Sequence, residues 1–114
     1  MNIGGEERPI KFGVNQTIEL CQFRGITVNE ADKLIPIIAS GNGNGSEARD
    51  FIWSALKDGA RFAEVDFPYT PYDVGDWMVD MEVKELEAFW KKYAEDMKPL
   101  LNKTIAKDKK KVTA

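Results

Sequence analysis

The 114-residue chain contains no histidine and a single cysteine, Cys21. Histidine is the commonest general base near neutral pH and a frequent metal ligand, so its absence removes most familiar catalytic and metal-binding arrangements. A lone cysteine forms no disulfide within the chain, which is typical of a reducing compartment. The acidic residues show no spacing that singles out a catalytic pair, although the sequence leaves open a carboxylate pair built from distant parts of the fold. We expect no enzymatic activity, no cofactor and no metal site.

Long apolar runs are also missing. No stretch approaches the length of a membrane span, and the N-terminal residues lack the apolar core of a secretory signal. We therefore expect no membrane partner.

The net charge of −3 is unevenly distributed. Residues 102–114 contain five lysines and one aspartate, whereas residues 1–101 contain 11 basic and 18 acidic groups. An acidic body argues against a nucleic-acid partner. The lysine-rich end is typical of a solvated, disordered tail. We predict a single helical domain with an N-terminal hairpin over residues 1–101, followed by a basic tail over residues 102–114.

Two amphipathic segments dominate residues 70–101. Thr70 can cap a helix, Pro71 suits the first helical position because its missing N–H would be unpaired there, and Asp73 follows the cap by three residues. Each segment has an apolar face that must be buried, either by the rest of the chain or by a partner. Their apolar residues recur at helical spacing: Val74, Trp77, Met78 and Met81 in the first segment, and Leu86, Phe89, Trp90, Tyr93, Met97 and Leu100 in the second, which begins near Val83.

Residues 2–12 are typical of a short β-hairpin with its turn at Gly4 and Gly5. Ile10 and Phe12 alternate with a polar residue, as in a half-buried strand. A two-stranded hairpin is not stable alone, so we expect it to lie on helices.

The first helix is predicted from Asn15, its expected cap, to Arg24, with Gly25 ending it in a left-handed conformation. Its inward side chains are expected to be Ile18, Cys21 and Gln22.

Two further helices are predicted before residue 60. Thr27 and Glu30 form a capping box for one of them, and Pro36 should kink or interrupt it. Ser46 is expected to cap the next helix, which Gly59 should stop. The whole pattern predicts a mainly α-helical fold with a minor β component, in which an N-terminal hairpin packs on a bundle of about five short amphipathic helices.

Aromatic side chains are concentrated between residues 62 and 90. Most large apolar residues of soluble domains pack in the core, and that interpretation applies to each of these. The alternative is a partner-binding surface, because aromatic anchors often dominate protein interfaces. The candidate partner-binding residues are Phe62, Phe67, Tyr69, Trp77 and Trp90.

An ordered set of short stretches resembles the tail assembly chaperones of long-tailed bacteriophages and prophages. The resemblance covers most of the chain and rests on residues 3–5 (Ile-Gly-Gly), 9–15 (Pro-Ile-Lys-Phe-Gly-Val-Asn), 25–27 (Gly-Ile-Thr), 52–59 (Ile-Trp-Ser-Ala-Leu-Lys-Asp-Gly), and Thr70 followed by 74–77 (Val-Gly-Asp-Trp).

The resemblance implies a non-catalytic assembly factor. Such proteins bind the tape measure protein, keep its apolar helices soluble and assist polymerisation of the tail tube protein around it. The resemblance also implies that the protein acts in the cytoplasm of the bacterial host and is missing from the mature virion. It supplies no catalytic residues, no cofactor and no metal.

Two other interpretations stay open. One is a structural head–tail connector or completion protein, and the other is a small acidic regulator or secretion chaperone. An uncovered apolar stripe could also pair copies of the chain into a homo-oligomer, as easily as it could bind a client.

Overall fold

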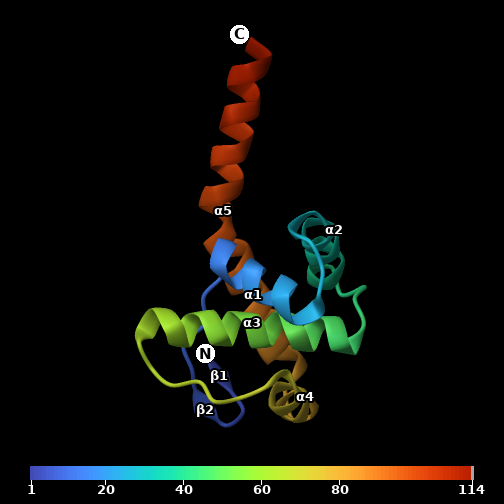
Figure 1. Ribbon diagram of the computed structural model, residues 1–114, viewed down its shortest axis with the longest axis vertical. Helices are drawn as coiled ribbons and strands as arrows, with labels where there is room; N and C mark the ends of the chain where they lie inside the picture. The colour runs from blue at the N-terminus through green and yellow to red at the C-terminus, as the bar shows by residue number, and fades with distance from the viewer. Residues whose placement is uncertain (114) are drawn as a thin grey trace.

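The computed structural model describes the backbone of residues 1–113 and the side chains of residues 1–99. Most of the described chain is helical, with a small two-stranded hairpin at the N-terminus (Figure 1), as the sequence predicts. In chain order the elements are β1 (Asn2–Ile3), β2 (Glu6–Glu7), α1 (Val14–Arg24), α2 (Val28–Ala39), α3 (Gly45–Ala63), α4 (Pro71–Val79) and α5 (Val83–Thr113).

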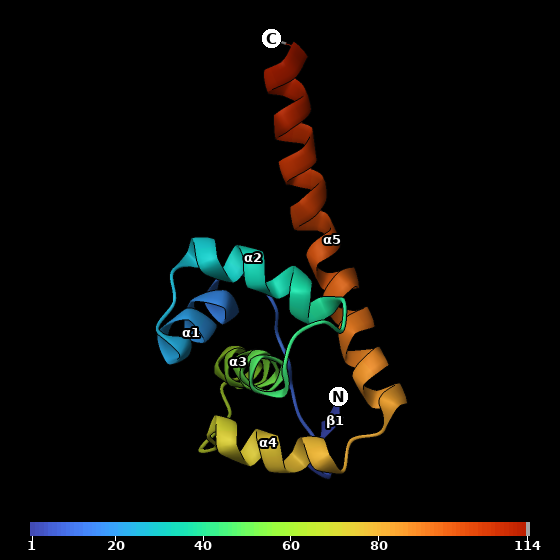
Figure 2. The ribbon, with the colours of Figure 1, turned by 90° about the vertical axis from the view of Figure 1, so that its right-hand side faces the viewer.

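Helix α3 lies at the centre of the molecule. Helices α1 and α2 lie on one side of it, and the hairpin and α4 lie on the other (Figures 1 and 2). Helix α5 passes along the flank of α3 and then continues beyond the body. The arrangement explains why α3 is buried nearly all round between Asp50 and Ala60, with Lys57 as the exposed exception.

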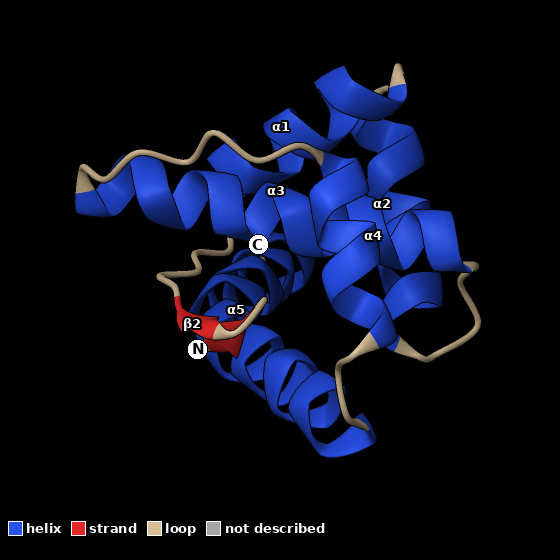
Figure 3. Ribbon diagram, turned by 90° about the horizontal axis from the view of Figure 1, so that it is seen from below, coloured by secondary structure: helices blue, strands red, loops and turns tan. Residues whose placement is uncertain are grey.

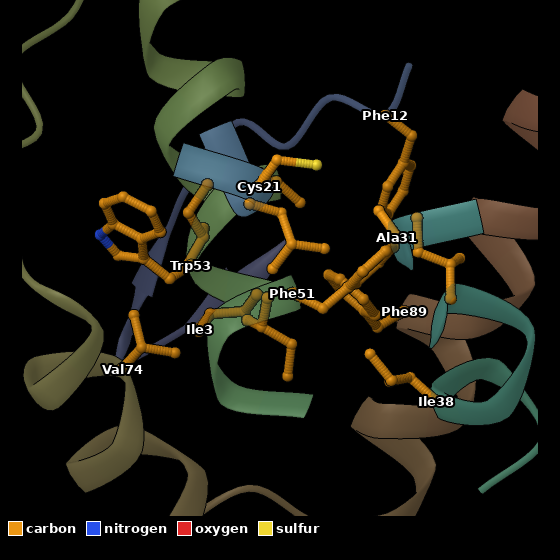
Figure 4. Packing of buried hydrophobic residues seen from close by; sticks show 14 residues of the cluster. Ile3, Phe12, Cys21, Ala31, Ile38, Phe51, Trp53, Val74 and Phe89 are labelled. Atoms are coloured by element: carbon orange, nitrogen blue, oxygen red, sulfur yellow. The ribbon is translucent and has the colours of Figure 1, made fainter. Parts of the chain in front are cut away.

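The core is formed largely where α3 meets α5 and the segment before α1. The ring of Phe51 on α3 lies 6.1 Å from those of Phe12 and Phe89, and Phe12 meets Phe89 edge-on at 5.2 Å (Figure 4). All three side chains are buried. Burying a side chain of this size contributes roughly 1.5–3 kcal/mol, so this cluster attaches α5 to the body.

The caps of α2 and α4 are those predicted. Thr27 pairs with Glu30, and Thr70 pairs with Asp73, in reciprocal capping boxes. Two other predicted caps, Ser46 for α3 and Asn15 for α1, are wrong. Helix α3 is capped by Asn44, together with Glu47. Helix α1 starts at Val14 after Gly13, with no side-chain cap, so Asn15 lies inside the helix.

The prediction that Gly59 stops the third helix is also wrong, because α3 continues to Ala63. A Cβ atom on Gly59 would lie 2.3 Å from the carbonyl oxygen of Pro9 and 2.6 Å from the Cα of Ile10. Glycine is therefore required at this position by the close approach of the N-terminal segment and not by the helix end.

The hairpin pairs Ile3 with Glu6 around a two-residue turn. Both turn residues have positive φ, +68° at Gly4 and +79° at Gly5, as this hairpin type requires. A Cβ on Gly4 would lie 2.6 Å from the ring of Trp77, so the turn lies directly on α4. Seen from below, the hairpin lies beside α5 (Figure 3).

The segment around Ile10 and Phe12 forms no strand, which corrects that part of the prediction. The backbone N–H of Lys11 instead donates to the carbonyl oxygen of Ala55 on α3, over 3.1 Å. The predicted alternation does not hold in burial either: Phe12 is buried, but Ile10 and Lys11 are both half-buried.

The expected interruption of α2 at Pro36 and the expected disordered tail both differ from the structure. Helix α2 is not interrupted at Pro36, which lies in its last turn. Helix α5 starts at Val83 as predicted, and its apolar stripe packs on the core from Leu86 to Met97. The backbone of residues 102–113 continues α5, whereas the sequence predicts a disordered tail there. The domain boundary at residue 101 stays a prediction. The side chain of Leu100 lies outside the described residues.

Candidate functional site

The five candidate partner-binding residues do not form one surface. Trp90 on α5 is half-buried, with its ring 5.0 Å from Phe51 and 5.2 Å from Phe89. Tyr93 completes the cluster, 5.8 Å from Trp90. Trp90 therefore packs with the core between α3 and α5 and is separated from the other four candidates.

A second aromatic group forms where the connection between α3 and α4 meets α4. The Tyr69 ring lies 4.9 Å from Trp77 and 5.3 Å from Phe67. The guanidinium of Arg8 stacks on both Tyr69 and Trp77, at 4.6 and 4.3 Å, and Gly4 covers the Trp77 ring. The Trp77 side chain is thus half-buried and mainly holds the hairpin on α4.

Two of the exposed apolar side chains lie just before that cluster in the sequence. Phe62, in the last turn of α3, is 68% exposed, and Val65, just after the helix, is 52% exposed. The Nζ atom of Lys11 lies 4.9 Å from the Phe62 ring centroid. These two side chains, three residues apart, leave apolar area open to a partner.

We call Phe62, Val65, Phe67 and Tyr69 the linker surface. The backbone leaves α3 at Glu64 in a left-handed conformation, with φ of 57°, and then runs extended to Thr70. The indole N–H of Trp53 donates to the carbonyl oxygen of Tyr69 over 3.1 Å, which fixes this segment against α3. Its apolar side chains are thus presented by a backbone that is held in place.

A groove that the sequence did not reveal lies between α1, α2 and α5. It has a volume of about 210 Å³. Val14, Ile18 and Val28 in its wall are exposed, although Ile18 was predicted to face inward, and Gln22 is exposed as well. Cys21 is buried as predicted, and Gln16 and Leu20 take the inward positions of α1. The groove is lined by Gly13, Val14, Thr17, Ile18, Val28, Asp32 and Met97.

A larger hollow of about 370 Å³ lies under the hairpin turn. Its wall combines the Trp77 ring and Met81 with two carboxylates, Asp80 and Glu85. These groups come from α4, α5 and the turn between them.

Two buried carboxylates on α3 have structural partners. Asp50 accepts from Arg24 on α1 at 2.6 Å and from its neighbour Arg49 at 2.8 Å. Asp58 accepts from Arg61 at 2.7 Å, and its second oxygen has no partner among the described groups. The side chain of Gln16 donates to Ser54 over 2.8 Å. The Arg24–Asp50 and Gln16–Ser54 contacts join α1 to α3.

Two other titratable groups are perturbed. Burial raises the pKa of the Tyr93 phenol, and the negative charge of Asp32 raises it further. Burial also raises the pKa of the Cys21 thiol, with smaller effects of Asp32 and Glu30. Both shifts favour the neutral, less reactive form of the side chain.

Among the described side chains, no three acidic or cysteine residues lie close enough together to share a metal ion. Nor does any described helix combine the length and the apolar character needed to cross a membrane. Comparisons of the chain with protein-family models, curated proteins and solved structures found no match.

Proposed function

We propose that this protein is a non-catalytic tail assembly chaperone that binds the tape measure protein and assists assembly of the tail tube. The family assignment rests on the ordered stretches in the sequence. The observation that supports a protein-binding role is the linker surface, where Phe62 and Val65 expose large apolar side chains on an anchored backbone.

The proposed contact is between the linker surface and an apolar stripe on a client helix. Phe62 and Val65 would be the main anchors, because exposed side chains gain most by burial at an interface. Phe67 and Tyr69 would extend the same surface. Trp77 supports it from behind, whereas Trp90 lies in the α3–α5 cluster and would contribute through stability alone.

The proposal is tested by co-expression with the tape measure protein and the tail tube protein, followed by affinity capture and titration with purified tape measure fragments. The double variant Phe62→Asp/Val65→Asp should weaken binding by about tenfold or more, since it places two charges in the contact. Val79→Asp is the matched control, because Val79 is 83% exposed on α4, away from the linker surface. Circular dichroism should show the same helix content in all variants.

Two outcomes would contradict the proposal. If the unaltered protein captures neither client, the chaperone function is wrong. If it binds and the double variant binds equally well, the linker surface is not the client site. Finding the protein in purified particles would favour a structural head–tail component instead.

A further inference from the structure

Helix α5 extends well beyond the rest of the molecule. After Pro99 it continues to Thr113, and in two perpendicular views no other element lies beside this last part (Figures 1 and 2). We call residues 100–113 the overhang; at 1.5 Å per residue it is roughly 21 Å long. Most helices in proteins depend on packing of an apolar face for their stability, and in these two views no element of the chain lies beside the overhang.

The sequence of the overhang is suited to packing. Leu101 and Ile105 follow Met97 at intervals of four, so the apolar spacing of the packed part of α5 continues into the overhang. The end of the chain that contains the overhang is also basic. Residues 102–114 carry a net charge of +4, whereas residues 1–101 carry −7. A partner should therefore offer an apolar surface on an acidic body.

The groove between α1, α2 and α5 offers such a surface at the base of the overhang. Met97, which lines it, lies about one turn before Leu101, and Val14, Ile18 and Val28 supply exposed apolar wall. Among the described residues that line it, Asp32 is the one with a charge, and it is exposed. Among the described side chains, Asp32 has no ion-pair partner. A lysine-rich helix with an apolar stripe matches this lining in both respects.

We propose that the overhang of one copy fills the groove of a second copy, so that two chains pair through antiparallel α5 helices. The overhang cannot reach the groove of its own chain, because the end of α5 points away from the other elements (Figure 2). A two-fold axis near Leu101 would place Ile105 of each chain against the groove of the other. Both grooves are then filled by one symmetric contact.

The test is the dimerisation constant of the full chain, measured by sedimentation equilibrium. The unaltered protein should form dimers, and Ile18→Glu in the groove and Ile105→Glu in the overhang should each raise the dissociation constant by about tenfold or more. Val79→Glu, which changes an exposed valine on α4, is the matched control and should leave it unchanged. Dissociation should also become easier as salt is added, because opposite charges meet at the contact.

A second measurement fixes the geometry. Leu101→Cys should form a disulfide between two copies under mild oxidation, because the proposed axis brings the two positions together, and the buried Cys21 should not interfere. A protein that stays monomeric at every accessible concentration overturns the proposal. So does a dimer whose stability is unaffected by both glutamate variants, since its interface must lie elsewhere.

Discussion

At the scale of single residues, the body depends on a few contacts that join segments distant in the sequence. Gly59 lets the segment at Pro9 and Ile10 lie directly on α3. Asp50 holds Arg24 of α1 by a buried charge-assisted hydrogen bond. Such contacts leave little trace in local sequence patterns. The capping boxes at Thr27 and Thr70 are predictable because both partners lie within three residues, whereas the role of Gly59 depends on a residue 50 positions away.

Gly59→Ala should destabilise the fold by about 1–3 kcal/mol, because the new methyl group would meet backbone atoms of Pro9 and Ile10 that cannot move freely. The roughly 1 kcal/mol gained by replacing glycine inside a helix offsets only part of this range. Urea denaturation measures the change. Gly45→Ala in the first turn of α3 is the control, since no atom lies within 4 Å of its added Cβ, and it should be neutral or stabilising. Equal stability of both variants would contradict the proposed close packing.

The raised pKa of Tyr93 has a consequence at alkaline pH. The folded-state pKa of Tyr93 lies above its pKa in the unfolded chain, which is roughly 10. The contribution of the neutral phenol to the free energy of unfolding is therefore fully present below the unfolded-state pKa and is lost as pH rises through the folded-state pKa. The free energy of unfolding should therefore fall with pH in this range, and less steeply in Tyr93→Phe. Urea denaturation of both proteins at a series of alkaline pH values measures the two slopes. Parallel slopes would show that Tyr93 does not contribute.

At the scale of the elements, the caps of α2 and α4 and the end of α1 at Gly25 were predicted correctly, whereas the caps of α1 and α3 and the end of α3 were not. The apolar spacing of α4 and α5 correctly identified the faces that pack, from Val74 to Met97. The error at the start of α3 has a local reason: Asn44 and Ser46 are both good capping residues, and the glutamate three residues later selects Asn44. Ser46 instead donates its hydroxyl to the Asn44 side chain over 2.7 Å.

Asn44→Ala should therefore cost about 1 kcal/mol, the usual effect of removing a helix cap. Its side chain accepts from the backbone N–H of Glu47 over 2.9 Å, and that donor would lose its partner within the protein. Ser46→Ala is the control and should change the free energy of unfolding by less than about 0.5 kcal/mol, as expected of a surface substitution. The two variants are compared by thermal and urea denaturation. A larger loss for Ser46→Ala would assign the cap to Ser46 after all.

At the scale of the whole molecule, the sequence indicated where large apolar residues are concentrated but not which of them stay exposed. Trp77 and Trp90 look like binding anchors in the sequence, yet one is covered by Gly4 and Arg8 and the other packs on Phe51 and Phe89. The groove was missed for a related reason: Ile18 and Val28 belong to different helices, and their approach to α5 depends on how α1 and α2 pack on α3.

The two apolar surfaces share no described residue, and this separation predicts that their effects are independent. The segment that connects α3 to α4 runs beneath α3, whereas α1 and α2, which line the groove together with α5, lie above it (Figure 1). Phe62→Asp/Val65→Asp should therefore weaken client binding by about tenfold or more while leaving the dimerisation constant unchanged. Ile18→Glu should instead weaken dimerisation and leave client binding unchanged, since residues far apart with no shared partner act nearly additively. Capture assays and sedimentation on the same preparations test both halves. If Ile18→Glu reduced both activities by the same factor, client binding would require the dimer, and the surfaces would be coupled through assembly.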